Sequence, residues 1–348
     1  MKRFFTTILC LSMAVILALS ASGCNKKSAL VFNNAFFGST NDPSPGYTET
    51  LKYSVSNVNN YNELIKKEVE IFTDSLATYE YKGTYESVFS VVGVLPEEIE
   101  INVSEEITGT VYHLKTTLKL NSTYKVNGEY AEGGTQNQDG SVTYEDVVEN
   151  EVYFLKSGHS FAPVYSSGRQ KSSTLALSNK ANVIVYEYSY NTTYNTNKYT
   201  TVKGYVQEEP VTNKYEYTFK TVIDNAQLLF ALRSVTLEEK DNLNIPVVSP
   251  VYGKAQTLTI TNSSENTKSA TINGETVQIP VKNLNFKLAQ EYNTGTPQYA
   301  LIQKSSPNEQ VVPNKALLIE YAEPIISYGN FYSMGALVYT LTDVEING

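Results

Sequence analysis

A run of glutamates is the densest group of chemically active side chains in this sequence. Glu98 and Glu100 flank Ile99, so both would lie on one face of a strand, and Glu105 and Glu106 follow closely. Two carboxylates facing each other across about 5–9 Å can hydrolyse a glycosidic bond, and several carboxylate oxygens together can bind calcium. The spacing of these glutamates along the chain does not by itself produce a glycosidase pair or a calcium site. An acidic surface exposed to solvent explains the run.

The two histidines are a weak basis for catalysis. His113 lies within a predicted strand, and His159 lies in Ser157-Gly158-His159-Ser160, a predicted loop. A Ser/His/acid arrangement through His159 is formally available, but the Gly-x-Ser-x-Gly motif is absent. A zinc site needs three or four ligands, and the sequence contains no phosphate-binding or dinucleotide-binding glycine motif. We therefore expect no catalytic residue, metal site or cofactor. An extracytoplasmic hydrolase remains the third hypothesis.

Tyrosines are the more informative group, because the chain has 27 Tyr and 13 Phe but no Trp. Two aromatic sets alternate along two predicted strands: Tyr186, Tyr188 and Tyr190 in one, and Tyr215, Tyr217 and Phe219 in the other. Each set shares a face of its strand, so the six rings would form a ligand-binding platform if the strands pair. The alternative is a tyrosine-faced sheet whose hydroxyls reach solvent.

Alternating apolar and polar residues predict strands over most of the chain. The clearest are residues 48–55, 79–92, 110–126, 142–155, 183–190, 198–206, 214–222, 257–261, 316–321 and 336–341. Residues 269–279 predict a hairpin around Asn273-Gly274. Residues 63–72 fit a helix or a strand equally, and no fixed-period repeat indicates a propeller or solenoid.

Residues 224–233 interrupt the strands. Asp224 is a suitable helix N-cap, and Leu228, Leu229 and Leu232 form an apolar stripe that would pack on a sheet. Residues 244–250, which contain Pro246 and Pro250, could join two subdomains.

The N-terminus has the order of a secretory signal peptide. Lys2 and Arg3 precede an apolar run of 12 residues, 8–19, which is shorter than the ~20 residues of a membrane-spanning helix. Small residues then lead to Cys24. We expect a signal peptide at residues 1–23, a polar tether at 24–46 and a β-rich extracytoplasmic domain at 47–348.

Ala21-Ser22-Gly23-Cys24 resembles the lipobox of bacterial lipoproteins. This resemblance implies cleavage before Cys24 and a diacylglyceryl group on its thiol, with acyl chains such as palmitate holding the protein on the membrane. The other cysteine, Cys10, would leave with the signal peptide, so no disulfide can form. The predicted location is therefore a bacterial membrane, with the domain facing outside the cytoplasm.

The strand pattern predicts an all-β fold: a long-stranded, curved, antiparallel sheet, half-barrel-like, with one or two short helices. A β-sandwich is the alternative. The layout resembles half-barrel lipoproteins of the LolA and LppX type, in which a curved sheet covered by helices holds acyl chains. A net charge of −9 disfavours nucleic acid as a partner. We expect a non-enzymatic binder of an apolar ligand, lipid or envelope component, with a surface adhesin or glycan-binding module as the alternative.

Overall fold

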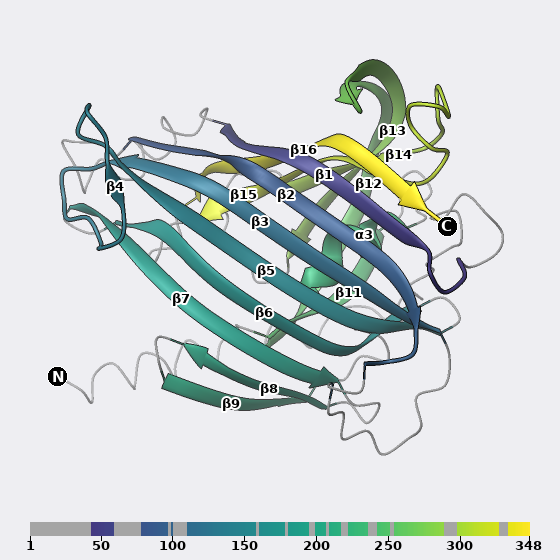
Figure 1. Ribbon diagram of the computed structural model, residues 1–348, viewed down its shortest axis with the longest axis horizontal. Coiled ribbons are helices and arrows are strands. Elements are labelled where there is room, and N and C mark those ends of the chain that lie inside the picture. The colour runs from purple at the N-terminus through teal and green to yellow at the C-terminus, as the bar shows by residue number, and fades with distance from the viewer. Residues whose placement is uncertain are drawn as a thin grey trace.

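The computed structural model describes residues 43–58, 78–96, 99, 110–157, 160–177, 180–194, 199–206, 209–216, 222–235, 242–250, 254–288, 298–326 and 333–348. Their strands belong to one 16-stranded sheet, which is curled and open (Figure 1). The predicted all-β fold with a curved antiparallel sheet is confirmed, and the described residues do not form the alternative two-sheet sandwich.

Residues 48–216 contribute β1 (Thr48–Val58), β2 (Thr78–Gly93), β3 (Val111–Lys125), β4 (Thr135–Gln136), β5 (Val142–Ser157), β6 (Ser160–Leu177), β7 (Ala181–Tyr194), β8 (Tyr199–Val206) and β9 (Glu209–Glu216). Residues 223–347 contribute β10 (Ile223–Asp224), the 3-10 helix η2 (Asn225–Gln227), α3 (Leu228–Leu232), β11 (Asn242–Ser249), β12 (Lys254–Ile272), β13 (Glu275–Leu288), β14 (Gln298–Gln303), β15 (Leu318–Ile326) and β16 (Ser333–Asn347).

The first and last strands, β1 and β16, are neighbours in the middle of the sheet. The strand order runs β10-β11-β12-β13-β14-β15-β16-β1-β2-β3-β5-β6-β7-β8-β9, with β4 paired to β5. Only β10 and β11 run parallel among the described strand pairs. Strand β16 pairs with β1, so one half of the sheet continues directly into the other.

Strict alternation fixes which side of each strand is buried. In β1, Leu51, Tyr53 and Val55 are buried, whereas Lys52 and Ser54 are exposed. Side chains at every second position point to the same face, so the apolar set faces the hollow side of the curl. This is the reason that residues 48–55 were predicted correctly as a strand.

The predicted Asn-Gly hairpin is confirmed, but its strands are longer than expected. Asn273 and Gly274 have φ of 52° and 83°, as a type I′ turn requires. The segments predicted separately at 257–261 and 269–272 are parts of one strand, β12. A register irregularity between Asn262 and Ser264 interrupts the alternation, which makes one strand look like two in the sequence.

The strand predicted at 214–222 begins earlier in the structure. Strand β9 covers Glu209–Glu216, and residues 217–221 lie outside the described residues. Pro210 lies within β9, which ends the sheet, where a residue without an N–H is tolerated. Segment 63–72 and Cys24 also lie outside the described residues. Residues 244–249 of the predicted joint at 244–250 belong to β11.

The predicted helix forms and lies inside the curl. It consists of η2 followed by α3, with Leu228 and Leu232 buried as expected. Phe230 packs against the sheet, with its ring centroid 4.8 Å from that of Phe89 and 5.4 Å from that of Phe154. Figure 1 shows this segment between strands β1–β7 on one side and β11–β15 on the other.

Candidate functional site

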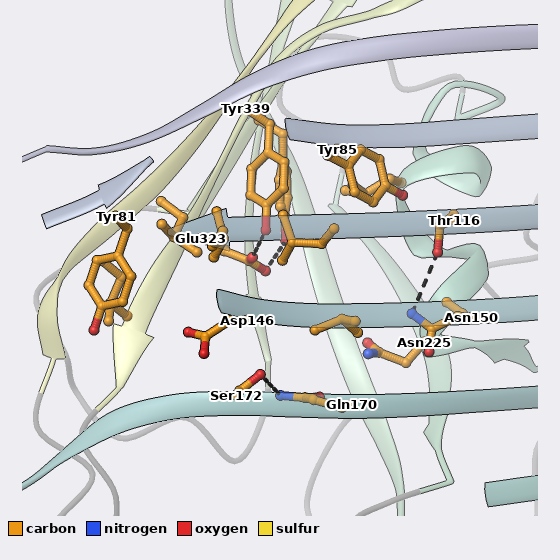
Figure 2. Close-up of a pocket in the computed structure, with 18 of the residues that line it drawn as sticks. Tyr81, Tyr85, Thr116, Asp146, Asn150, Gln170, Ser172, Asn225, Glu323 and Tyr339 are labelled. Carbon is orange, nitrogen blue, oxygen red and sulfur yellow. Dashed lines mark hydrogen bonds between the residues drawn. The ribbon is translucent and has the colours of Figure 1, made fainter. Parts of the chain in front are cut away.

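A pocket lies between the helical segment and the concave face of the sheet. Its volume is about 350 Å³. Strands β2, β3, β5, β6 and β7 form one side, and β15, β16, η2 and α3 complete it (Figure 2). The apolar part of its lining comes from Leu118, Leu120, Val148, Leu228, Leu229, Ile325 and Leu337.

Asp224 fixes the first turn of the helical segment. Its Oδ1 accepts a hydrogen bond from Ala226 N at 2.8 Å, and its own N–H donates to Gln227 Oε1 at 2.9 Å, which completes a capping box. Its Oδ2 accepts from the hydroxyls of Ser166, at 2.6 Å, and Tyr194. Burial raises the pKa of this fully enclosed carboxyl. Asp224 therefore both starts the helix and attaches it to β6 and β7.

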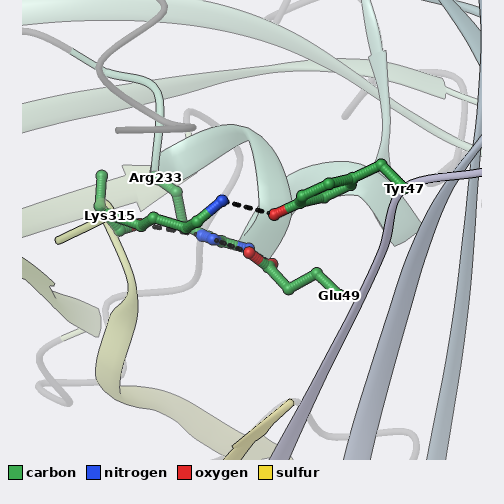
Figure 3. A network of polar contacts seen from close by, with 5 residues as sticks. Tyr47, Glu49, Arg233 and Lys315 are labelled. Carbon is green, nitrogen blue, oxygen red and sulfur yellow. Dashed lines mark hydrogen bonds and ion pairs between the residues drawn. The ribbon is translucent and has the colours of Figure 1, made fainter. Parts of the chain in front are cut away.

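Arg233 attaches the other end of the helical segment to β1 (Figure 3). Its Nη1 and Nη2 lie 2.5 Å and 3.0 Å from the two carboxylate oxygens of Glu49, and its Nε donates to Ala316 O at 2.9 Å. Beside this ion pair, Lys315 Nζ donates to the hydroxyl of Tyr47 at 2.6 Å. Burial opposes the charge of Arg233, but the Glu49 carboxylate keeps its pKa above the usual value. The helix thus spans the hollow between two buried polar attachments.

Asp146 projects from β5 into the pocket. Its Oδ2 accepts from the hydroxyls of Ser122 and Ser173, the latter at 2.8 Å, and its Oδ1 accepts from Ser173 N at 2.8 Å. Burial raises the pKa of Asp146 to about 6, although these hydrogen bonds act in the opposite direction. The carboxyl group is therefore ionised at neutral pH but gives up much of its hydration.

Glu323 projects from β15 into the same pocket. Its two oxygens accept hydrogen bonds from the hydroxyls of Tyr339 and Tyr321, the latter at 3.2 Å. Burial raises the pKa of Glu323, and the two tyrosine hydroxyls partly offset this effect. Figure 2 shows Glu323 with the hydroxyl of Tyr339 directed at it, and Asp146 on a neighbouring part of the lining.

Three tyrosine rings stand around Glu323. Tyr85 meets Tyr339 edge to face, with centroids 5.5 Å apart and an interplanar angle of 89°. Tyr321 is tilted by 53° against Tyr339 at 5.4 Å. All three line the pocket. Edge-to-face and tilted arrangements of this kind are the ones that aromatic pairs prefer.

The predicted aromatic set on β7 lies beside this pocket. Tyr186 lines it, and Tyr188 stacks on Tyr186 at 6.2 Å with an angle of 12°. Gln170 Nε2 donates to the hydroxyl of Tyr186 at 3.0 Å, and the hydroxyl of Tyr188 donates to Gln170 Oε1. Tyr190 is buried, and its hydroxyl donates to Asn150 Oδ1 at 3.1 Å.

The second predicted aromatic set does not adjoin the first. Strand β8 lies between β7 and β9, so the two strands do not pair directly, which was the condition for a six-ring platform. Tyr215 pairs with Thr200, which itself pairs with Tyr194 rather than with the tyrosines at 186–190. Tyr217 and Phe219 lie outside the described residues.

His113 lies on a different face from the pocket. Its Nε2 is 2.7 Å from Glu151 Oε1, its Nδ1 is 3.4 Å from Ser90 Oγ, and its ring stacks on Tyr153 at 4.4 Å. The hydrogen bond from His113 lowers the pKa of Glu151. None of these residues lines the pocket. His159, Glu98 and Glu100 lie outside the described residues.

Sequence reasoning missed Asp146 and Glu323. Asp146 has the same strand parity as the buried Tyr144 and Val152, and this is the signal that could have identified an inward-facing acid. Within the described ranges, no three His, Cys, Asp or Glu side chains are grouped for metal binding. No helix in the described part of the chain is long and apolar enough to cross a bilayer.

Comparisons with known proteins provide only distant structural similarity. No family model matches the chain, and neither does any curated protein. Among solved structures, the chain is similar to a beta-barrel-like protein of the domain of unknown function DUF1849 from Brucella abortus. That match has a TM-score of 0.43 and 7% sequence identity, and it covers 88% of this chain and 100% of the other. The comparisons therefore attach no activity to the pocket.

Proposed function

We propose that this chain is an extracytoplasmic lipoprotein, anchored to a bacterial membrane through Cys24, that binds an apolar or amphipathic ligand without catalysing a reaction. The observation that carries this proposal is the pocket of about 350 Å³ on the concave face of the sheet. Small-ligand sites are concave and largely apolar, with a few placed polar groups.

The apolar lining supports binding of a hydrophobic group. Leu118 and Leu120 of β3 line the pocket together with Leu228 and Leu229 of the helical segment. A ligand that covers these side chains gains about 25 cal/mol for each Å² of apolar surface removed from water. The polar groups at Asp146 and Glu323 add a hydrophilic end, so the ligand class that fits the whole pocket is amphipathic.

The attachments of the helix support a preformed pocket. Asp224 and Arg233 hold the two ends of the helical segment against different parts of the sheet. A wall fixed in this way needs little reorganisation when a ligand enters, and such preorganisation improves affinity.

A tryptophan introduced into the pocket tests this function. Leu118 lines the pocket, whereas Lys119, its neighbour on β3, is exposed on the opposite face. The full chain is purified from membranes in detergent, and its non-covalent ligand is measured by native mass spectrometry. Binding of the neutral dye N-phenyl-1-naphthylamine is measured in parallel.

Wild type and Lys119→Trp should both carry a ligand or bind the dye, and Leu118→Trp should lose at least nine-tenths of either signal. Circular dichroism and the unfolding midpoint establish that both variants are folded. Equal binding by the folded Leu118→Trp variant, or no binding by wild type, would overturn the proposed function.

A further inference from the structure

We propose that the pocket recognises a positively charged amine head group, which it holds between Asp146, Glu323 and the rings of Tyr85, Tyr321 and Tyr339. This inference rests on the proposed function and specifies its ligand class. The full ligand would be an amphiphile with a cationic head and a short apolar tail.

The charge of the lining is one-sided. Among the described residues that line the pocket, the charged side chains are Asp146 and Glu323, and both are carboxylates. Lys171 is the cation that influences the pKa of Asp146. It is exposed, and its influence is smaller than that of burial or of the hydrogen bonds from Ser122 and Ser173. An incoming cation would therefore meet two negative groups and no positive competitor among these lining residues.

The hydrogen-bonding capacity of the two carboxylates is largely used, but their charge is not compensated. Asp146 accepts from two serine hydroxyls and one amide, and each oxygen of Glu323 accepts from a tyrosine hydroxyl. These donors are neutral. A polyol would offer more neutral donors to oxygens that already have them, whereas a cation supplies the opposite charge that the enclosed carboxylates lack.

The tyrosine rings favour the same ligand. Tyr85, Tyr321 and Tyr339 line the pocket, and their planes meet at 89° for Tyr85 and Tyr339 and at 53° for Tyr321 and Tyr339. The negative face of an aromatic ring attracts an ammonium group within about 6 Å, and the attraction grows when water is excluded. Aromatic cages in other proteins recognise alkylated ammonium groups through this attraction.

The remaining lining suits a tail rather than a second charge. Beyond the two acids, it consists of neutral polar side chains such as Asn150 and Gln170 and of the leucines at 118, 120, 228 and 229. An anionic head group, as in a fatty acid, would be repelled by Asp146 and Glu323. The charge of the lining therefore separates amine-bearing amphiphiles from acidic ones.

Three probes with the same tail and different heads test the inference. Hexyltrimethylammonium, hexanol and hexanoate are titrated by calorimetry at pH 7.5 into the full chain in nanodiscs, with empty nanodiscs subtracted. The ammonium probe should bind at least tenfold more tightly than hexanol, and hexanoate should bind most weakly. Asp146→Asn and Glu323→Gln should each reduce the advantage of the ammonium probe at least fivefold.

Glu145→Gln is the matched control, because Glu145 is exposed and adjoins Asp146 on β5. It should leave all three affinities unchanged. Equal affinities of hexyltrimethylammonium and hexanol for wild type would overturn the cation inference and leave the proposed apolar binder intact. Failure of all three probes and of N-phenyl-1-naphthylamine to bind would overturn both. The wild-type comparison decides the matter even where a variant does not fold.

Discussion

Glu49 and Arg233, 184 residues apart in the chain, form a bidentate ion pair inside the curled sheet. Their side chains are only 1% and 2% exposed. Glu49 belongs to β1 at the middle of the sheet, and Arg233 directly follows α3. The pair therefore couples the position of the pocket's helical wall to the strand that joins the two halves of the sheet.

Removal of one member of this pair should strongly destabilise the fold. Glu49→Ala leaves the guanidinium of Arg233 buried without its counter-charge, and we expect a loss of about 4 kcal/mol in the free energy of unfolding. The double variant Glu49→Leu/Arg233→Met should recover most of this loss. Urea denaturation of the full chain measures both changes.

The exposed pair Arg169–Glu149 provides the control for this prediction. The side chain of Arg169 is 72% exposed, so solvent screens its attraction to Glu149. Glu149→Ala should not change the unfolding midpoint measurably. Similar losses of unfolding free energy in Glu49→Ala and Glu149→Ala would contradict the stabilising role of the buried Glu49–Arg233 ion pair.

Asp224→Ala should detach the start of the helix from β6 and β7. The change removes the helix cap and leaves the hydroxyls of Ser166 and Tyr194 without their shared acceptor. Loss of a cap and of buried acceptors costs about 3 kcal/mol of unfolding free energy in total. Tyr194→Phe, which removes one donor, should cost about 1 kcal/mol. An unchanged urea midpoint in Asp224→Ala would show that the cap does not hold the helix.

Asp146 should make the fold less stable as the pH rises from about 4 to about 6. In that window the folded protein retains the proton on Asp146, whose pKa is raised to about 6, whereas the unfolded chain has released it. Above pH 6 the carboxyl is ionised in both states, and the full cost of burying the charge applies. The shift corresponds to about 3 kcal/mol.

Asp146→Asn isolates this contribution from other titrating groups. The groups around Asp146 are the hydroxyls of Ser122, Tyr124 and Ser173 and the charge of Lys171. The stability of the variant relative to wild type should rise by about 3 kcal/mol between pH 4 and pH 8. Urea denaturation across this range provides the measurement, and a constant difference would contradict the raised pKa.

Cys24→Ser should abolish membrane attachment. The thiol of Cys24 is the predicted lipidation site, and serine cannot form the thioether. Wild type should incorporate labelled fatty acid and show globomycin-sensitive processing, and so should the control Cys10→Ser. A Cys24→Ser protein that remains lipid-labelled and membrane-bound would contradict the proposed anchor.

Local patterns in the sequence determined the secondary structure well. Alternation in β1, the Asn273-Gly274 turn and the helix after Asp224 all follow from interactions within a few residues. The errors arose where a local rule competes with position in the sheet. A bulge splits the pattern of β12, and Pro210 is tolerated because β9 is an edge strand.

The sequence by itself determined an all-β chain with tyrosines alternating along its strands and one capped helix, because these features depend on local spacing. Tertiary structure alone decided that Asp146 of β5 and Glu323 of β15 line one pocket. Four strands, β16, β1, β2 and β3, separate them within the sheet. Only the curl of that sheet brings their faces around a common hollow, and the helix held by Asp224 and Arg233 completes the wall.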